Sequence, residues 1–357
     1  MPNMMRFHIS RLACTVAIIG AVFGAAPPVA AADQMTHVVF PGQSIQRAVD
    51  AAEPGDTVLV TPGTYRESIT VSKPGITLSG MGRATVIQPG TEKAGNRCAE
   101  AGNGICVMGT KEHDVERVTI ASLTVTGFTS TGVFAMATDG LTVRNVTAVK
   151  NGVWGIAQER SAHGVFRKNT ARDNGDAGLF LANTIKEEAG AADTGGTLVE
   201  RNRLEGNRIG ITVRRLRNLT VARNHLTGNC AGVFVVGDEN KPKAGALTVR
   251  DNTLVKNNKS CPKTARLDAL QGSGIVLTGA EDTLVTHNRV IGNVGASPLS
   301  GGIVLFKSFV GTTSDRNRIT DNTLEGNAPA DLVNTDTGKD NTFTHNTCRA
   351  SRPAGMC

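Results

Sequence analysis

The chain has 357 residues, with 38 Lys and Arg against 31 Asp and Glu, which gives a formal net charge of +7. Aromatic residues make up only 4 % of it, and Trp154 and Tyr65 are the single residues of their types. This composition argues against a broad sugar-stacking platform and against a nucleic-acid interface of interleaved aromatic residues. The mild charge is typical of a solvated surface and is compatible with an acidic polysaccharide as partner.

Residues 1–32 have the pattern of a secretory signal peptide. Arg6 and Arg11 precede an apolar stretch from Leu12 to Ala26, and three alanines end at Ala32, after which we expect cleavage. No later run approaches the roughly 20 apolar residues that a membrane-spanning helix needs. We therefore expect residues 33–357 to be a single exported domain, a secreted extracellular monomer without a membrane span and without a nucleic-acid partner.

The segment 42–52 is predicted to be a short helix that caps the first part of the domain. Ser44 is a suitable N-cap, and Ile45, Ala48 and Val49 share one apolar face. A strand is expected next, over residues 57–60, because its apolar and β-branched residues are typical of strands.

An internal repeat dominates the rest of the chain. Each unit contains a glycine followed by an aliphatic residue, and the shortest spacings between units are 22 or 23 residues. The steps are Gly104-Ile105, Gly132-Val133, Gly155-Ile156, Gly178-Leu179, Gly210-Ile211, Gly232-Val233, Gly274-Ile275 and Gly302-Ile303.

Each unit also carries two asparagines, five residues apart. The first position is occupied by Asn202, Asn224, Asn252, Asn288 and Asn322, and the second by Asn207, Asn229, Asn257, Asn293 and Asn327. Asn tolerates the left-handed backbone of tight turns and can bond neighbouring chain segments. We therefore predict two structural ladders, in which each Asn bonds the coils above and below it.

Short alternating strands without intervening helices exclude a doubly wound sheet and indicate a solenoid of stacked coils. We predict cap and first coils over residues 36–90, coils over 91–330 and a C-terminal cap over 331–357, where the glycine step is lost. Eight positions should form the dry core, where polar or Ala substitution should cost a few kcal/mol. They are Ile211, Val213, Val233, Val235, Ile275, Leu277, Ile303 and Leu305.

Six cysteines remain beyond the signal peptide, an even number that favours disulfides over metal ligands in an oxidising compartment. Six cysteines allow 15 connectivities, and the repeat register favours pairing of consecutive residues. The hypothesis is therefore Cys98 with Cys106, Cys230 with Cys261, and Cys348 with Cys357.

The run SIQRAVDAA over residues 44–52, followed by GDTV over 55–58 and PGTY over 62–65, resembles the opening of pectin-lyase-like right-handed β-helix proteins. The later coils are similar to the β-helix repeats of NosD-type nitrous-oxide-reductase accessory proteins and of carbohydrate-binding and sugar-hydrolase modules. The resemblance covers essentially the whole chain after the signal peptide. It implies an all-β fold, a right-handed parallel β-helix, which carries lyases, hydrolases, epimerases and adhesins alike.

Four insertions interrupt the repeat, over residues 184–196, 237–246, 258–272 and 294–301. They flank the strand that begins at each glycine step, so the outer face of that strand is the predicted floor of a binding groove. Phe180 and Phe234 point outward there if alternation holds. They are candidate ligand-binding platforms, although burial beneath the long insertions would explain them as well.

Glu159, Asp176 and Arg214 are the charged residues expected nearest to this groove. A uronate lyase needs a base and a cation, and a glycosidase needs two carboxylates. The three residues are therefore the catalytic candidates for either scheme, with solvated surface charge as the alternative.

Several family motifs are absent from the sequence. It has no paired Asp with a downstream Gly-His-Gly as in polygalacturonases, no Asp-Pro-His-Glu as in alginate epimerases, and no acidic cluster like the calcium site of pectate lyases. A calcium requirement stays open. The best aligned histidines, His287 and His345, should lie about 10 Å apart, because a whole coil separates them, which is too far to ligate one metal ion. We predict no metal site.

The leading hypothesis is a secreted protein that binds a polysaccharide and cleaves it as a lyase or hydrolase. The alternative is a non-enzymatic solenoid that acts as a cell-surface or matrix interaction protein. An enzyme requires titratable side chains that converge in one cleft, whereas a binding protein requires only shape and scattered contacts.

Overall fold

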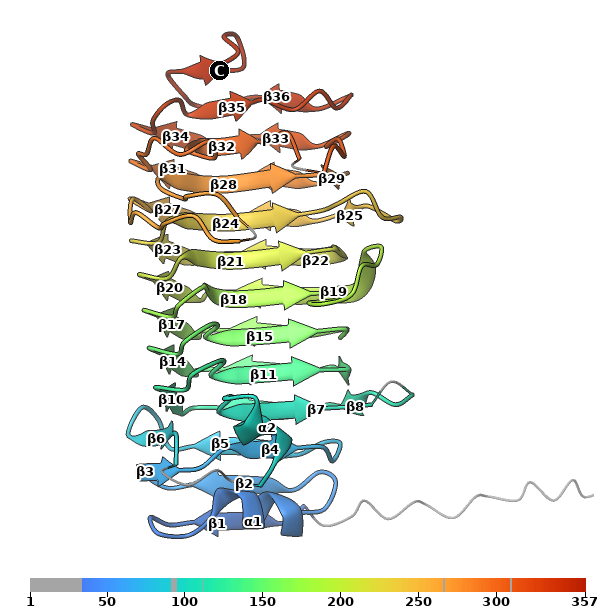
Figure 1. The fold of residues 1–357 in the computed structure, drawn as a ribbon, viewed down its shortest axis with the longest axis vertical. Helices are drawn as coiled ribbons and strands as arrows, with labels where there is room; N and C mark the ends of the chain where they lie inside the picture. Colours follow the sequence, from blue (N-terminus) through green and yellow to red (C-terminus); the bar gives the residue numbers. More distant parts are fainter. Residues whose placement is uncertain (1–33, 91–94, 111, 266, 309) are drawn as a thin grey trace, which may run out of the picture. The chain divides into compact units, whose positions relative to one another are not determined.

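The computed structural model describes residues 34–90, 95–110, 112–265, 267–308 and 310–357. The predicted signal peptide lies outside these residues. The described chain winds into coils, and each coil contributes one strand to each of up to three parallel sheets. Figure 1 shows the coils following one another in chain order, from β1 and β2 in blue to β35 and β36 in red. This is the predicted parallel β-helix.

In the described residues, the first sheet has 14 strands. They are β1 (Thr36–Val39), β2 (Thr57–Val60), β5 (Thr77–Gly80), β9 (Thr119–Ala121), β13 (Thr142–Arg144), β16 (Val165–Arg167), β19 (Ala192–Glu200), β22 (Leu216–Ala222), β25 (Ala244–Gly245), β26 (Thr248–Arg250), β29 (Ala280–Glu281), β30 (Leu284–Thr286), β33 (Arg318–Thr320) and β36 (Thr342–Thr344). β19 absorbs the end of the first predicted insertion and has an irregularity between Asp193 and Thr197.

The second sheet, counted over the same part of the chain, has 10 strands. They are β3 (Gly63–Arg66), β6 (Thr85–Gln88), β10 (Thr124–Thr126), β14 (Thr147–Val149), β17 (Thr170–Arg172), β20 (Arg203–Glu205), β23 (His225–Thr227), β27 (Thr253–Val255), β31 (Arg289–Ile291) and β34 (Thr323–Glu325). A separate pair is formed by β8 (Val115–Glu116) and β12 (Thr138–Asp139).

The third sheet contains the glycine steps and has 11 strands within the described ranges. They are β4 (Ile69–Val71), β7 (Ile105–Met108), β11 (Val133–Met136), β15 (Ile156–Glu159), β18 (Ala177–Ala182), β21 (Ile209–Arg214), β24 (Ala231–Val236), β28 (Ser273–Thr278), β32 (Gly301–Leu305), β35 (Leu332–Asn334) and β37 (Ser351–Arg352).

The register of the third sheet confirms the repeat alignment. The aliphatic residue of each glycine step pairs with that of the next coil, from Ile105 to Ile303. All eight predicted core positions are at most 1 % exposed and belong to one continuous apolar cluster. The glycine is required because a Cβ at Gly210 would lie 2.7 Å from the carbonyl oxygen of Gly232.

Both Asn ladders are present. In the second, the Nδ2 of each Asn donates to the Oδ1 of the Asn in the next coil, from Asn151 through Asn174 to Asn327, where the carboxylate of Asp331 accepts the last bond. The first ladder repeats this pattern from Asn202 to Asn346.

One detail of the ladder prediction was wrong. The left-handed backbone belongs to the residue before each ladder Asn, with φ between 50° and 69° at positions such as Arg201, Gly206, Gly228 and Asp321. The Asn itself is therefore free to use its amide for the coil-to-coil bonds, while the preceding residue makes the turn.

The predicted capping helix is α1 (Ile45–Ala51), and a second short helix, α2 (Arg97–Glu100), was not predicted. Ser44 accepts a hydrogen bond from the Arg47 amide, and Ile45 and Val49 are buried against the first coils. The carboxylate of Glu67 accepts from the amides of Ile45 and Gln46, so an anion lies at the N-terminus of the helix.

Asp56 fastens the cap to the first coil, and it is nearly buried. Hydrogen bonds from the amide of Glu53, from His37 and from the amide of Met35 lower the pKa of Asp56 to about 2. A lowered pKa in the folded state means that the ionised form stabilises the fold above about pH 4, and that this contribution is lost as the pH falls towards 2.

We expect Asp56→Asn to lower the melting temperature near neutral pH, and the difference from the wild type to shrink as the pH falls from about 4 to about 2. Thermal unfolding followed by circular dichroism over this range measures the effect. A difference that stays constant down to pH 2 would contradict this role for the Asp56 charge.

The three predicted disulfides are confirmed: Cys98–Cys106, Cys230–Cys261 and Cys348–Cys357. Cys230–Cys261 spans 31 residues and holds the insertion 258–272 over the third sheet.

We expect Cys230→Ser/Cys261→Ser to lower the free energy of unfolding by roughly 3–4 kcal/mol, because the closed loop is long. Cys348→Ser/Cys357→Ser, with a separation of 9 residues, is the matched control and should cost about 1 kcal/mol less. Urea unfolding measures the free energy of unfolding of both double variants. Equal losses would show that loop closure is not the main cause of the stabilisation by Cys230–Cys261.

Candidate functional site

A nine-residue segment, here called the strap, follows β18 and comprises residues 183–191. It is closed on itself by hydrogen bonds from Asn183 Nδ2 to the carbonyl of Gly190, at 2.6 Å, and from Thr184 Oγ1 to the carbonyl of Glu187, at 2.5 Å. Its tip, from Ile185 to Glu187, is directed over the third sheet.

Three side chains from neighbouring coils hold the strap. Glu159 Oε1 accepts from the amide of Ile185 at 2.9 Å, and Arg214 Nη1 donates to the carbonyl of the same residue at 3.2 Å. Arg215, whose side chain is 5 % exposed, donates to the Glu187 carbonyl and forms ion pairs with Glu188 and Asp238. Asp238 belongs to the insertion 237–246, which also bonds the strap directly, because the amide of Ala191 donates to the carbonyl of Pro242 at 2.8 Å.

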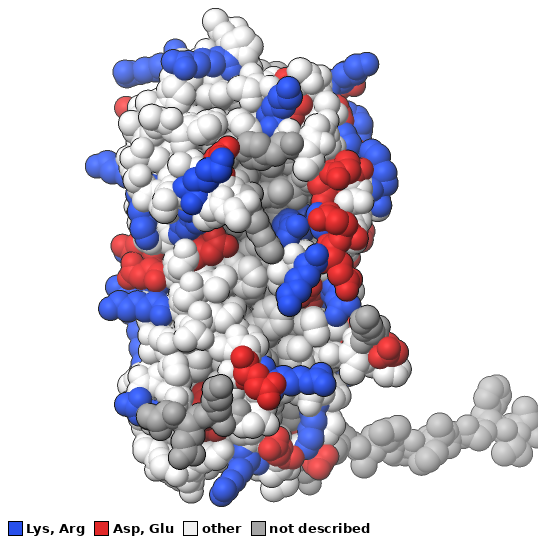
Figure 2. Space-filling view, in the orientation of Figure 1, with Lys and Arg blue, Asp and Glu red and all other residues white. Residues whose placement is uncertain are grey.

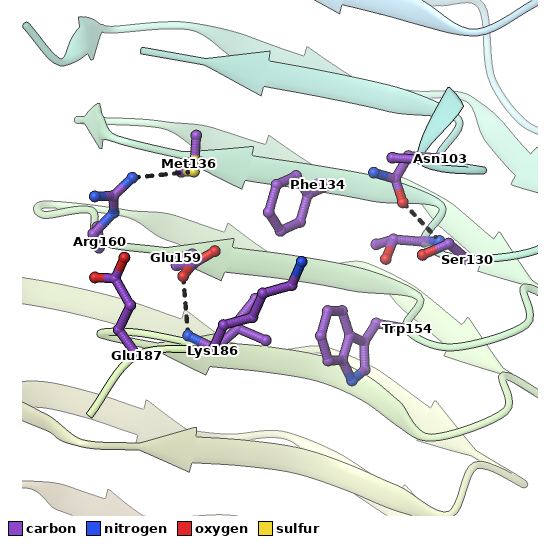
Figure 3. A pocket seen from close by; sticks show the side chains of 12 residues that line it. Asn103, Ser130, Phe134, Met136, Trp154, Glu159, Arg160, Lys186 and Glu187 are labelled. Atoms are coloured by element: carbon purple, nitrogen blue, oxygen red, sulfur yellow. Dashed lines mark hydrogen bonds between the residues drawn. The ribbon is translucent and has the colours of Figure 1, made fainter. Parts of the chain in front are cut away.

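A groove of about 490 Å³ lies between the strap and the turn after α2 (Figure 3). Such a volume is within the range of small-molecule sites. Its lining residues come from the coils of β7, β11 and β15 and from the strap. They are Ala101, Asn103, Ser130, Thr131, Phe134, Met136, Trp154, Glu159, Arg160, Ile185, Lys186 and Glu187.

Trp154 is the most firmly positioned aromatic residue of the groove. Its ring stacks on Phe180 with the centroids 4.3 Å apart and an angle of 14° between the planes. Its Nε1 donates to Asp176 Oδ2 at 3.0 Å. The indole therefore has both its polar edge and one face occupied by protein, and it remains partly exposed at the groove.

Four charged side chains line the groove in addition. Glu159 and Arg160 are at the end of β15, and Lys186 and Glu187 come from the strap; Figure 3 shows Lys186 reaching across the groove. Arg160 Nη2 lies 3.3 Å from the sulfur of Met136, and within the described residues its buried Nε has no hydrogen-bond partner. A buried donor of this kind is costly unless a ligand or water meets it.

The predicted site residues divide into two groups. Glu159 lines the groove, whereas Asp176 lies beneath Trp154 and Arg214 beneath the strap. Phe180 is 7 % exposed and Phe234 is 3 % exposed, and both belong to an apolar cluster between the third sheet and the insertions. The insertions thus cover most of the predicted floor.

The predicted site residues do not include Trp154, Arg160, Lys186 and Glu187. Trp154 directly precedes a glycine step, at the same position as Thr131 in the coil before, so the repeat alignment could have placed it at the groove. Lys186 and Glu187 lie on an insertion, whose path the repeat does not determine.

The surface around the groove carries charges of both signs. Figure 2 shows small groups on this face in which basic and acidic side chains are neighbours, with wide uncharged areas between the groups. Among the described residues, no three His, Cys, Asp or Glu side chains gather so as to hold a metal ion. No helix in the described part of the chain is long and apolar enough to cross a membrane.

Comparison with known families gives two matches. Residues 68–189 and 95–254 match the family described as "Right handed beta helix region", and these matches together cover just over half of the 357 residues. Residues 183–352 match the family described as "Periplasmic copper-binding protein (NosD)". No curated protein matches the chain.

Solved structures of three carbohydrate-active enzymes are similar in fold. The mannuronan C-5 epimerase A-module of Azotobacter vinelandii is 18 % identical, with a TM-score of 0.55, and the match covers 85 % of this chain and 90 % of that one. The alginate lyase of Paenibacillus sp. is 14 % identical, with a TM-score of 0.58 and coverage of 85 % and 99 %. The DFA-IIIase of Arthrobacter chlorophenolicus is 14 % identical, with a TM-score of 0.57 and coverage of 85 % and 81 %. At these identities the likeness shows the fold alone.

Proposed function

Since this chain belongs to the right-handed β-helix family and has a groove on the outer face of its third sheet, we propose that it binds a carbohydrate in that groove, beside Trp154. The observation that carries the proposal is the fixed indole of Trp154. An aromatic ring held by Phe180 and Asp176 offers a rigid apolar surface to the C–H face of a sugar, at little cost in conformational entropy.

The polar lining supports the same ligand class. Ser130 is partly exposed in the groove and can exchange hydrogen bonds with hydroxyl groups, and Arg160 lines the same groove. Convergent polar groups around an apolar surface are typical of small-molecule sites. Two of the enzymes of similar fold are named for the polysaccharides mannuronan and alginate.

The protein acts outside the cytoplasm. Three disulfides form stably in oxidising compartments, and the second matched family is periplasmic by its description. In our proposal, residues 1–32 direct export as a cleaved signal peptide and the remaining chain is secreted.

Trp154 also provides the test, because it is the only tryptophan of the chain. We expect its fluorescence to change in a saturable manner when acidic or neutral polysaccharides and their oligosaccharides are added to the oxidised protein, with and without calcium. Free N-acetyltryptophanamide is the control for inner-filter effects. An unchanged spectrum across a broad panel, from protein shown to be folded, would overturn the proposal in favour of a non-enzymatic interaction solenoid.

Cleavage of the bound carbohydrate is the second candidate function. The observation in its favour is that two carboxylates, of Glu159 and Glu187, and two cations, of Arg160 and Lys186, line the same groove. Two carboxylates suit a glycosidase, whereas a base with a neighbouring cation suits a lyase. In this assignment Glu159 is the catalytic candidate, while Asp176 positions Trp154 and Arg214 positions the strap.

Release of reducing ends would establish a hydrolase, and ultraviolet absorbance from an unsaturated product would establish a lyase. Glu159→Gln should then abolish turnover and retain binding. If the wild type binds but releases neither product, the protein is a binding protein only.

Copper does not fit the described residues, although the second matched family is named for it. All six cysteines beyond the signal peptide form disulfides. Thr286 pairs with Thr320, and Thr320 with Thr344, so a whole coil separates His287 from His345. We therefore assign no copper site to this part of the chain.

A further inference from the structure

We infer that the groove takes a short oligosaccharide, or the end of a longer chain, lying along the strands rather than along the axis of the β-helix. This inference rests on the carbohydrate binding proposed above. It narrows the ligand from any polysaccharide to one whose bound part spans few sugar units.

The residue that directly follows the aliphatic residue of each glycine step faces outward from the third sheet, and these residues together are here called the outer column. Its members are Cys106, Phe134, Ala157, Phe180, Thr212, Phe234, Val276 and Val304. A polysaccharide that followed the axis of the β-helix would have to contact this column coil after coil.

The column is closed on the C-terminal side of the groove. From Phe180 to Val304 every member is at most 7 % exposed. The covering residues include Ile185 of the strap, Leu270 of the insertion 258–272 and Leu299 of the insertion 294–301. A ligand could follow the column in this direction only if all three segments left the sheet.

The column is also closed on the N-terminal side. Cys106 is 2 % exposed, and its disulfide to Cys98 holds α2 over the sheet. Ala101 and Asn103, which follow α2, form the edge of the groove there. Phe134 is thus the one partly exposed member of the outer column.

The open part is correspondingly small. The groove is lined by residues of the coils of β11 and β15, but Ala157 of β15 is itself only 1 % exposed, and the neighbouring coils are covered, so the open width is at most about 10 Å at roughly 4.8 Å per coil. Along the strands, four residues of about 3.3 Å each give about 13 Å. The volume of about 490 Å³ agrees with a ligand of drug size, such as a disaccharide or trisaccharide.

The polarity of the groove changes in the strand direction. Asn103, Ser130 and Trp154 precede their strands and are uncharged, whereas Glu159 and Arg160 are at the strand end; Lys186 of the strap extends from that side towards Phe134 and Trp154 (Figure 3). A ligand lying along the strands would therefore place one sugar ring on Trp154 and a polar or ionised group at the far end. This gradient gives the ligand a direction.

The test is a titration of the full, oxidised protein with a size series, from monosaccharide to hexasaccharide, prepared from the polysaccharide that gives the strongest Trp154 response. We expect the affinity to rise up to the disaccharide or trisaccharide and then to stay constant within about twofold. A further tenfold rise from trisaccharide to hexasaccharide would overturn the inference and leave the proposed function standing. No response at any length would overturn the proposed function itself.

Two substitutions in the outer column sharpen the test. Phe134→Ala, in the open part, should weaken binding of every oligosaccharide that binds, by fivefold or more. Phe234→Leu, in the covered part, is the matched control and should leave the affinity unchanged at every length, with the fold of both variants checked by thermal unfolding. Selective weakening of the longer ligands by Phe234→Leu would show that the ligand follows the axis and would overturn the inference.

Discussion

Asn229→Ala is expected to lower the free energy of unfolding by roughly 3 kcal/mol or more. This is a large loss for the removal of a single side-chain amide from a turn. Asn229 is fully buried. Its Oδ1 accepts two bonds from Asn207, and its Nδ2 donates to the carbonyl of Leu204 and to Asn257 Oδ1. Removal of the amide takes a partner from buried donors and acceptors in the two neighbouring coils, at about 1–3 kcal/mol for each group that is left unsatisfied.

Urea unfolding followed by circular dichroism measures this loss, with Asn145→Gly as the matched control. Asn145 is exposed and has a φ of 54°, a conformation that glycine adopts without strain, so its replacement should change stability little. If the two variants unfolded at the same urea concentration, the ladder would contribute nothing beyond turn formation.

Trp154→Ala is expected to weaken carbohydrate binding by at least tenfold, which corresponds to about 1.4 kcal/mol. The substitution removes the flat surface that Phe180 and Asp176 hold at the groove, together with the ring contact to Phe180 and one hydrogen bond to Asp176. Isothermal titration calorimetry is the suitable measurement, because the variant lacks the fluorescent residue.

Trp154→Phe keeps an aromatic face but loses the bond to Asp176, so it should bind with intermediate affinity. Affinities that fall in the order wild type, Trp154→Phe, Trp154→Ala would show that the aromatic face itself contributes to binding. Equal affinity of the Ala variant and the wild type, with both folded, would remove Trp154 from the site and with it the observation on which the proposed function depends.

The repeat made the architecture predictable. Gly210-Ile211 and Gly232-Val233 lie one coil apart in sequence and pair in the structure, because a parallel ladder fixes which residues face each other. The same argument correctly paired the cysteines, since Cys98 and Cys106 lie close to the same coil. Alternation then determined which side of each strand faces the core.

The candidate site was only partly predictable. Phe134 and Phe234 occupy the same outward column, yet Phe134 is partly exposed and Phe234 is 3 % exposed. The difference comes from the insertions, whose conformation depends on contacts such as Arg215 with Asp238 and not on the repeat. Periodicity therefore indicates which residues face outward, whereas the loops decide which of them a ligand can reach.

The second Asn ladder has a direction, and this has an electrostatic consequence. From Asn151 onward one N–H of every amide donates to the Oδ1 of the later coil, while the other donates to a backbone carbonyl of the earlier coil. Each Oδ1 therefore faces the earlier coil, and the side-chain carbonyl dipoles are aligned along the ladder. Aligned dipoles strengthen one another and leave a partial positive charge at the donor end, as in an α-helix. The buried carboxylate of Asp331 lies at that end, so the row of amides is terminated by the ion that its polarity favours.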